Sequence, residues 1–287
     1  MMQFTEARKS IEPLYLTADD ARRIEAAEEF GSLRYAEAMK LQRPQWNSAW
    51  EKFGGGHLTF VAKGAPVGRA HALGFSGKVS AEDIEHVEEF YFERGTAAQV
   101  DVCPYADPSL LEALDRRNFR VAEFNQTLAR WIMPEETLGA RVGGIQIRAV
   151  KPEEVQEWSA LLARIFFADQ WQQFSTFFSP WATFSNSLSL VAVFNGKMVA
   201  GASGLIIPEH NLAAFFGAGT LAEFRGRGIQ SAFMQERLRI AQRAGCELAV
   251  TLTMPGTTSQ RNVERAGFRV AYTKVVVKKP LLGPSLA

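Results

Sequence analysis

One short sequence recurs near the end of each half of this chain, and it limits the folds that the chain can adopt. Phe-Arg-Val-Ala stands at 119–122 and again at 268–271. Both copies follow an apolar strand, a polar turn and a short helix, which is predicted at 109–117 and at 259–266. Self-similarity at a long period indicates duplicated structural units. We therefore expect two copies of one fold, with a chance recurrence of strand, helix and strand as the alternative.

The chain has 287 residues, a length that suits two domains. The segment 134–144 near its midpoint is polar, rich in glycine and without sustained periodicity, which is typical of a linker. We predict an N-terminal domain over 1–135, a linker over 136–144 and a C-terminal domain over 145–287.

The order of predicted elements indicates the fold class. In the N-terminal half they include a hairpin over 57–73 and a helix over 81–94. In the C-terminal half they are strand 145–150, helices across 152–184, strands 188–194, 198–207 and 212–221, helix 229–244, strand 247–253, helix 259–266 and strand 268–277. Asn195-Gly196 is a strong hairpin signal, and Gly245 stands where a helix C-cap needs a left-handed residue. Because hairpins precede a single strand–helix–strand crossover, we predict an α+β fold with mixed, mostly antiparallel sheets flanked by helices.

Composition excludes several classes of partner. Thirty-two Lys and Arg against 31 Asp and Glu give a net charge of +1, so no global field favours nucleic acid or an anionic membrane. No apolar stretch is long enough for a bilayer, and the charged N-terminus has no signal-peptide core, so we expect a cytoplasmic protein. The two cysteines and four histidines show no zinc spacing, and we predict no metal.

Any anion site must therefore be local, and Arg225-Gly-Arg-Gly228 is the candidate. It joins the apolar strand 212–221 to the amphipathic helix 229–244, where glycines allow backbone N–H groups to surround a phosphate. The P-loop pattern GxxxxGK[ST] is absent, and GxGxxG fails because Ser231 replaces its third glycine. A surface turn with solvated arginines is the alternative.

The run Thr220–Ser231 resembles motif A of the GNAT superfamily of acyl-CoA N-acyltransferases, written (Q/R)xxGx(G/A). Arg225 and Gly228 match its first and fourth positions, and Gln230 replaces the small residue at the sixth. Residues 259–268 resemble the closing helix and Gly-Phe turn of the family. The resemblance covers about 145–279, whereas 10–133 resembles a degenerate GNAT domain only through its topology and the repeated motif. It implies two tandem GNAT-like domains.

The resemblance implies acetyl-CoA as the cofactor. Its pyrophosphate would meet the N–H groups at the start of helix 229–244, and strand 212–221 would offer backbone groups to the pantetheine arm and to an oxyanion hole. The implied cofactor-binding residues are Thr220, Leu221, Ala222, Arg225, Gly226, Arg227, Gly228, Ile229, Gln230, Ser259 and Asn262. Ser259 also suits a helix N-cap, and Asn262 also suits a solvated helix position.

Acyl transfer to an amine needs a base and a proton donor for the thiolate. The tyrosine that many family members place four residues before the Gly of Gly-Phe is Val263 here. Tyr272 is the candidate donor, and Glu209 and Glu223 are the candidate bases. His210 and Glu247 are alternative bases, and a chain of water molecules would also suffice. Each of the four candidate bases also suits a solvated position.

The segment 166–184 is rich in aromatic residues, which are 11% of the whole chain. Family resemblance implies that this segment borders the acceptor pocket. The candidate acceptor residues are Asp169, Trp171, Phe174, Phe178 and Trp181. The alternative is that these rings pack against the N-terminal domain.

The N-terminal copy has acidic residues where a phosphate loop would stand. Glu82, Asp83 and Glu85 suit a helix dipole but repel a diphosphate, so we expect no CoA binding by this domain.

The function implied for the whole chain is N-acetylation of a small-molecule amine by direct attack in a ternary complex, by a monomer or homodimer. The missing tyrosine at 263 supports an alternative, a non-catalytic CoA-sensing or interaction protein. Transfer of a longer acyl chain is a third possibility.

Overall fold

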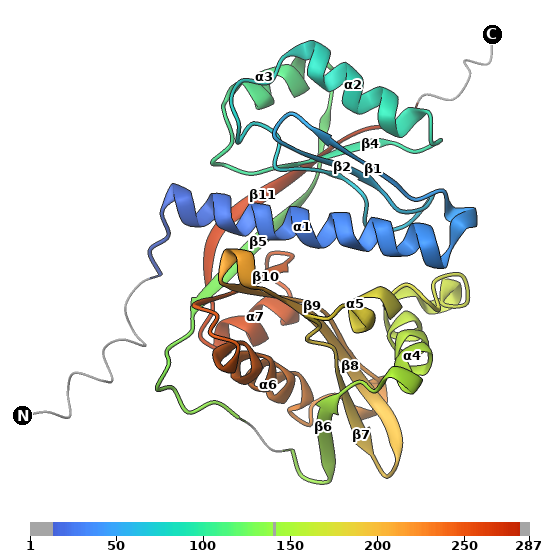
Figure 1. Cartoon of the computed structure of the whole chain (residues 1–287), viewed down its shortest axis with the longest axis vertical. Coiled ribbons are helices and arrows are strands. Elements are labelled where there is room, and N and C mark those ends of the chain that lie inside the picture. The colour runs from blue at the N-terminus through green and yellow to red at the C-terminus, as the bar shows by residue number, and fades with distance from the viewer. Residues whose placement is uncertain (1–13, 140–141, 282–287) are drawn as a thin grey trace, which may run out of the picture. The chain divides into compact units, whose positions relative to one another are not determined.

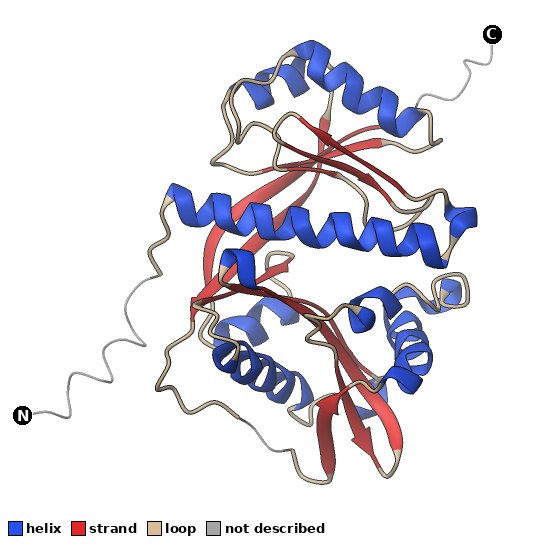
Figure 2. Ribbon diagram, viewed as in Figure 1, coloured by secondary structure: helices blue, strands red, loops and turns tan. Residues whose placement is uncertain are grey.

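The computed structural model describes residues 14–139 and 142–281, which form two compact units. We call Thr127–Ala271 the C-terminal unit, and Leu16–Gln126 together with the chain from Tyr272 onward the N-terminal unit. Each unit contains a mixed, mostly antiparallel sheet with helices, so the predicted α+β class is confirmed (Figures 1 and 2).

The sheet of the C-terminal unit has the order β10-β9-β8-β7-β6, in which only β9 and β10 are parallel among these neighbours. Its strands are β6 (Ile145–Ala149), β7 (Leu190–Phe194), β8 (Lys197–Ile207), β9 (Leu212–Thr220) and β10 (Leu248–Thr253). Its helices are α4 (Val155–Phe167), α5 (Ser179–Thr183), α6 (Ile229–Arg243) and α7 (Thr258–Arg265), with short 3₁₀ turns η2 (Pro152–Glu154), η3 (Ala168–Gln170), η4 (Pro208–His210) and η5 (Ala222–Phe224).

Local sequence signals explain these boundaries. Asn195 and Gly196 have positive φ angles of 48° and 76°, which a two-residue turn between β7 and β8 requires. Gly245 has a φ of 78° just after α6, and its N–H donates to Gln242 O. The predicted strands and helices of this half are therefore confirmed to within a few residues.

The N-terminal unit repeats the same order of elements. Its elements are α1 (Ala18–Gln42), η1 (Pro44–Trp46), β1 (Ala49–Phe53), β2 (Gly56–Phe60), β3 (Ala70–His71), α2 (Ala81–Phe92), β4 (Ala98–Val102) and α3 (Ser109–Arg116). The sheet order is β1-β2-β3-β4, in which β3 and β4 are parallel as β9 and β10 are in the other unit. This parallel pair with its crossover helix supports the predicted duplication.

Helix α1 is a long element that was not predicted from the sequence. It begins with a capping box, in which the Thr17 side chain accepts from Asp20 N and Asp20 accepts from Thr17 N. Its buried face includes Ile24, Tyr35 and Met39.

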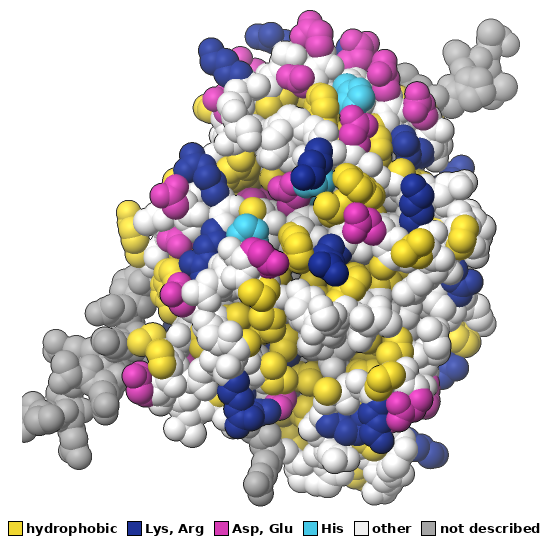
Figure 3. Space-filling model, in the orientation of Figure 1, with side chains coloured by type: hydrophobic (Ala, Val, Ile, Leu, Met, Phe, Trp, Pro, Cys, Tyr) yellow, Lys and Arg dark blue, Asp and Glu magenta, His cyan; other side chains and the backbone are white. Residues whose placement is uncertain are grey.

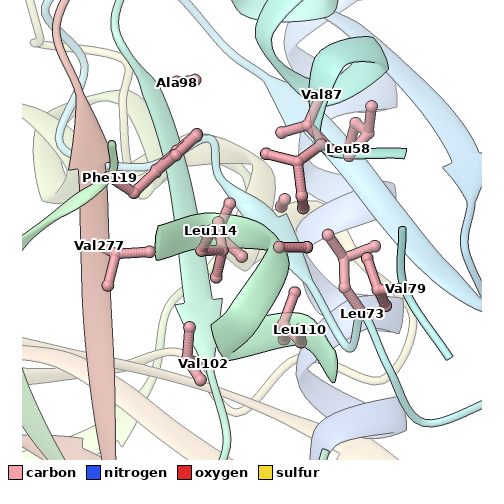
Figure 4. Packing of buried hydrophobic residues seen from close by; sticks show 14 of the residues in the cluster. Leu58, Leu73, Val79, Val87, Ala98, Val102, Leu110, Leu114, Phe119 and Val277 are labelled. Atoms are coloured by element: carbon pink, nitrogen blue, oxygen red, sulfur yellow. The ribbon is translucent and has the colours of Figure 1, made fainter. Parts of the chain in front are cut away.

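Two strands contribute residues to both units. β5 (Arg120–Trp131) is divided at Gln126, and β11 (Arg269–Lys279) is divided at Ala271. In the N-terminal unit β11 pairs antiparallel with β4, with Val275 opposite Val102. Figure 4 shows Val277 in the apolar core of that unit, beside Phe119 and Leu114.

The compact units thus divide the chain differently from the predicted domains. Tyr272 onward was assigned to the C-terminal domain, whereas the structure places it in the N-terminal unit. The physical reason is pairing: residues Val275–Lys279 of β11 pair with β4, which is a strand of the N-terminal unit. In the C-terminal unit the neighbour of β10 is instead β5, and Ile132 N donates to Glu247 O at 2.8 Å.

The distribution of surface charge and the two cysteines do not identify a partner. On the face shown in Figure 3, basic and acidic side chains are interspersed, with acidic ones gathered over α2 and α3. Cys103 and Cys246 are buried and are not joined in a disulfide bond. Over the described residues no helix is long and apolar enough to cross a bilayer, and no cluster of His, Cys, Asp and Glu could hold a metal.

Candidate active site

A cleft forms where the two parallel strands of the C-terminal unit part. β9 and β10 pair from Leu212 opposite Leu248 to Phe215 opposite Thr251, and β9 then continues to Thr220. Its register against β8 shifts between Gly201 and Ser203, which marks a bulge. A bulge increases strand twist and bends the strand, so the backbone groups of β9 beyond Phe215 are directed into a cleft rather than to β10.

The cleft has a volume of about 830 Å³ and lies within the C-terminal unit. Its walls come from the end of β9, the glycine loop, the first turns of α6, the end of β10 and helix α7. Of the predicted cofactor-binding residues, it is lined by Thr220, Arg225, Gly226, Gly228, Ile229, Gln230, Ser259 and Asn262. Leu221, Ala222 and Arg227 are not among the lining residues.

The glycine loop has the conformation that an anion site needs. Gly226 and Gly228 have φ angles of 76° and 81°, and a Cβ at either position would meet nothing within 4 Å. Gly228 is the N-cap of α6 and supplies no side chain, so the first-turn N–H groups have no capping acceptor. These N–H groups and the positive end of the helix dipole can bind a phosphate, so the residues present fit the pyrophosphate of CoA.

Gln230 explains how the motif tolerates its departure at the sixth position. Its Nε2 donates to Thr220 Oγ1 at 2.8 Å, which ties the side chain back to β9. Arg225 Nε donates to Thr220 O at 3.3 Å and holds the loop to the same strand end. The Arg227 guanidinium lies 5.1 Å from the centre of the Phe224 ring, which accounts for its place outside the lining.

Helix α7 closes another side of the cleft, and its start corrects one prediction. The N-cap is Thr257, whose side chain accepts from Gln260 N at 3.2 Å, so Ser259 is not the cap. Ser259 and Asn262 stand three positions apart on one helix face, and both line the cleft. Val263, at the position of the family's tyrosine, is buried and also lines it.

The structure does not bring the candidate proton-transfer residues into the cleft. Tyr272 lies in the N-terminal unit, where its hydroxyl donates to Glu25 Oε1 at 2.7 Å and burial raises its pKa. Glu209 is exposed in η4, before β9 begins, and Glu223 is exposed in η5. Neither lines the cleft. Among the described residues that line it there is no Asp, Glu, His or Tyr.

The candidate acceptor residues form an aromatic cluster behind the cleft instead of its wall. Phe174 and Phe178 are buried, and Phe178 contacts Phe166, a lining residue, with ring centres 5.5 Å apart. Trp181 packs on Phe216, another lining residue, at 4.3 Å. Asp169 is exposed, and Trp171 lies 4.3 Å from the Arg164 guanidinium. Phe178 and Trp181 therefore support the wall of the cleft through their contacts with Phe166 and Phe216.

Sequence reasoning missed Arg237, which lines the inner part of the cleft. It follows Ile229 and Phe233 at four-residue intervals, on the buried face of α6. The signal that could have identified it is an arginine on an otherwise apolar helix face.

Comparisons with known proteins agree with this geometry. Residues 153–268 match the model of the acetyltransferase (GNAT) family. The matched residues lie within the C-terminal unit. For this unit the match supports the enzyme class of the acyl-CoA N-acetyltransferases. No curated protein matches the chain.

Solved GNAT structures share the fold over nearly the whole chain. A GCN5-related N-acetyltransferase from Sphaerobacter thermophilus has a TM-score of 0.57 at 17% identity, over 93% of this chain and 95% of that one. A tandem GNAT protein from the clavulanic acid biosynthesis pathway has a TM-score of 0.62 at 14% identity, over 88% of each chain. A GCN5-related N-acetyltransferase from Kribbella flavida has a TM-score of 0.59 at 18% identity, over 88% and 97%. The GNAT fold and the tandem arrangement predicted from the sequence are confirmed.

Proposed function

We propose that the C-terminal unit transfers an acetyl group from acetyl-CoA to a primary amine of a small molecule, by direct attack in a ternary complex. The observation that carries this proposal is the glycine loop. Both Gly226 and Gly228 are left-handed, and the uncapped start of α6 opens into the cleft between β9 and β10.

Each part of the cleft has a role in this reaction. The N–H groups at the start of α6 bind the pyrophosphate, and Ser259 and Asn262 offer polar side chains to the pantetheine arm. The backbone of β9 beyond Phe215 supplies an N–H donor for an oxyanion, a contribution of about 3 kcal/mol in enzymes that use one. Acetyl-CoA supplies a thioester, an activated acyl donor for the amine. We infer that the protein acts in the cytoplasm, because its two cysteines are buried thiols and a reducing compartment keeps them so.

The side chains around the cleft favour solvent as the route for protons. An alkyl ammonium has a pKa of about 10, so it must lose a proton before it attacks. No Asp, Glu, His or Tyr stands among the described lining residues, so a water chain through the open cleft is the route we propose. The same observation favours one alternative, a CoA-sensing protein that binds the cofactor without transferring its acyl group.

Calorimetry with acetyl-CoA, combined with a thiol-release screen against primary amines, tests both functions. We expect saturable binding and thiol release that depends on the amine. Tight binding without turnover for every amine would support the sensing function, and absence of binding would refute both.

A further inference from the structure

Arg237 is a buried cation without a counterion. It is 2% exposed and lines the cleft. Nine positions separate it from Gly228 along α6, a rise of about 13 Å, so it lies well inside the cleft from the phosphate loop. Within the described residues no carboxylate forms an ion pair with it, and the lining residues contain no Asp or Glu.

Only one edge of the guanidinium is used within the protein. Nη1 donates to Ser203 O at 3.0 Å and to Phe216 O at 3.5 Å, and one face lies 4.7 Å from the centre of the Phe215 ring. Nε has no hydrogen-bond partner among the described residues, and the bonds that Arg237 forms there come from Nη1. The edge formed by Nε and Nη2 is therefore available to a ligand.

The burial of an unpaired charge explains why this edge of Arg237 would bind an anion. A buried charge without a counterion is costly, so buried charges in proteins are nearly always paired. Burial lowers the pKa of Arg237 to about 9, which still leaves it protonated at neutral pH. The two parallel N–H groups of a free guanidinium edge match the two oxygens of a carboxylate. The backbone carbonyls of Ser203 and Phe216 are neutral, so they do not supply the negative charge that would pair with Arg237.

We propose that Arg237 binds a carboxylate of the substrate through Nε and Nη2. Resting on the proposed function, this inference names the substrate class: either the acyl group ends in a carboxylate, or the amine acceptor is an amino acid. Both sources place the same anion in the inner cleft.

Matched ligands separate the two sources. Calorimetry compares succinyl-CoA with butyryl-CoA, which have the same number of acyl carbons and differ in the terminal carboxylate. With acetyl-CoA present, thiol release compares L-phenylalanine with phenethylamine, which differ by one carboxylate. We expect the carboxylate ligand to be favoured at least tenfold in one of the two arms, in affinity or in kcat/KM.

The variants are Arg237→Met, which keeps the stem and removes the charge, and Arg237→Lys, which keeps the charge without the planar edge. The control is Arg243→Met on the exposed last turn of α6. The preference should disappear in R237M, shrink in R237K and persist in R243M, whose affinity for butyryl-CoA should stay within about twofold of the wild type.

If R237M does not fold, the wild-type comparison of matched ligands still decides. Wild-type protein that binds butyryl-CoA and acetyl-CoA but shows no carboxylate preference in either arm would overturn this inference and leave the proposed function intact. A preference that survives in R237M would also overturn it. Absence of binding by every CoA ester would refute the proposed function together with the inference.

Discussion

Replacing Gly228 by glutamate tests the phosphate loop directly. The backbone there has a φ of 81°, and a Cβ would meet nothing within 4 Å, so a side chain fits without a clash. A non-glycine residue in the left-handed region costs about 1–2 kcal/mol of stability. The carboxylate then lies beside the bound phosphates. Two like charges 4 Å apart repel by about 1 kcal/mol in water and by about 4 kcal/mol at the effective dielectric of a protein surface.

We therefore expect G228E to weaken acetyl-CoA binding by about 2–4 kcal/mol, a factor of roughly 30 to 1,000 in Kd. Isothermal calorimetry at physiological salt measures this loss, and the loss should diminish as added salt screens the repulsion. Gly228→Ala carries the same backbone strain without the charge, and its affinity should fall by less than tenfold.

Gly245→Glu is the matched control for strain and charge. Gly245 also has a positive φ, 78°, and open space for a Cβ, but it follows the other end of α6. Helix α6 has 15 residues and is about 22 Å long, more than two Debye lengths at physiological salt. G245E should lose stability much as G228E does and should bind acetyl-CoA like the wild type. Equal affinities of G228E and G245E would refute a phosphate site in this loop.

Three further substitutions test the surrounding structure. Gly219→Val should lower the unfolding free energy by about 1–3 kcal/mol in denaturant titrations, because its Cβ would stand 2.8 Å from Ile165 Cγ2; an unchanged midpoint would contradict this packing. Lys274→Met should cost about 3–5 kcal/mol at pH 7 because it leaves the buried Glu25 carboxylate without its cation. That deficit should shrink toward acidic pH, where the carboxylate binds a proton, and a deficit independent of pH would argue against an ionic origin. Gln230→Ala loses one hydrogen bond to Thr220, so calorimetry should find acetyl-CoA affinity within about fivefold of the wild type; loss of binding would show that the amide itself holds the ligand.

Local signals made much of the C-terminal unit predictable. Asn195-Gly196 and Gly245 fix a turn and a helix end through their own backbone preferences, so the predicted boundaries lie close to those observed. The phosphate loop was also accessible, because Arg225 and Gly228 stand in a contiguous motif. These features depend on residues that are near one another in the sequence.

Features that depend on long-range pairing were not predictable in this way. The alternation around Val275 and Val277 predicts a strand, but it does not say that the strand pairs with β4. Tyr272 was placed with the C-terminal domain for that reason, and its hydroxyl instead meets Glu25 of α1. Arg237 was not predicted as a site residue because its role depends on where β9 and β10 separate. The residue pattern of a single helix does not show that position.

The two crossover helices, α2 and α6, differ at their N-cap residues, and that difference separates their functions. α2 begins after Ser80, whose Oγ accepts from Asp83 N at 3.1 Å while Asp83 Oδ2 accepts from Ser80 N at 2.7 Å. Side chains of the helix itself therefore occupy its N-terminus and add negative charge, with a stabilisation of about 1 kcal/mol. α6 begins after Gly228 and lacks such a cap, so its N–H groups stay open to a ligand at the expense of that stabilisation. We therefore expect a calorimetric stoichiometry of one acetyl-CoA per chain, and G228E should weaken binding at that one site. A stoichiometry of two would show that a capped, acidic helix start can still hold a diphosphate, contrary to this electrostatic argument.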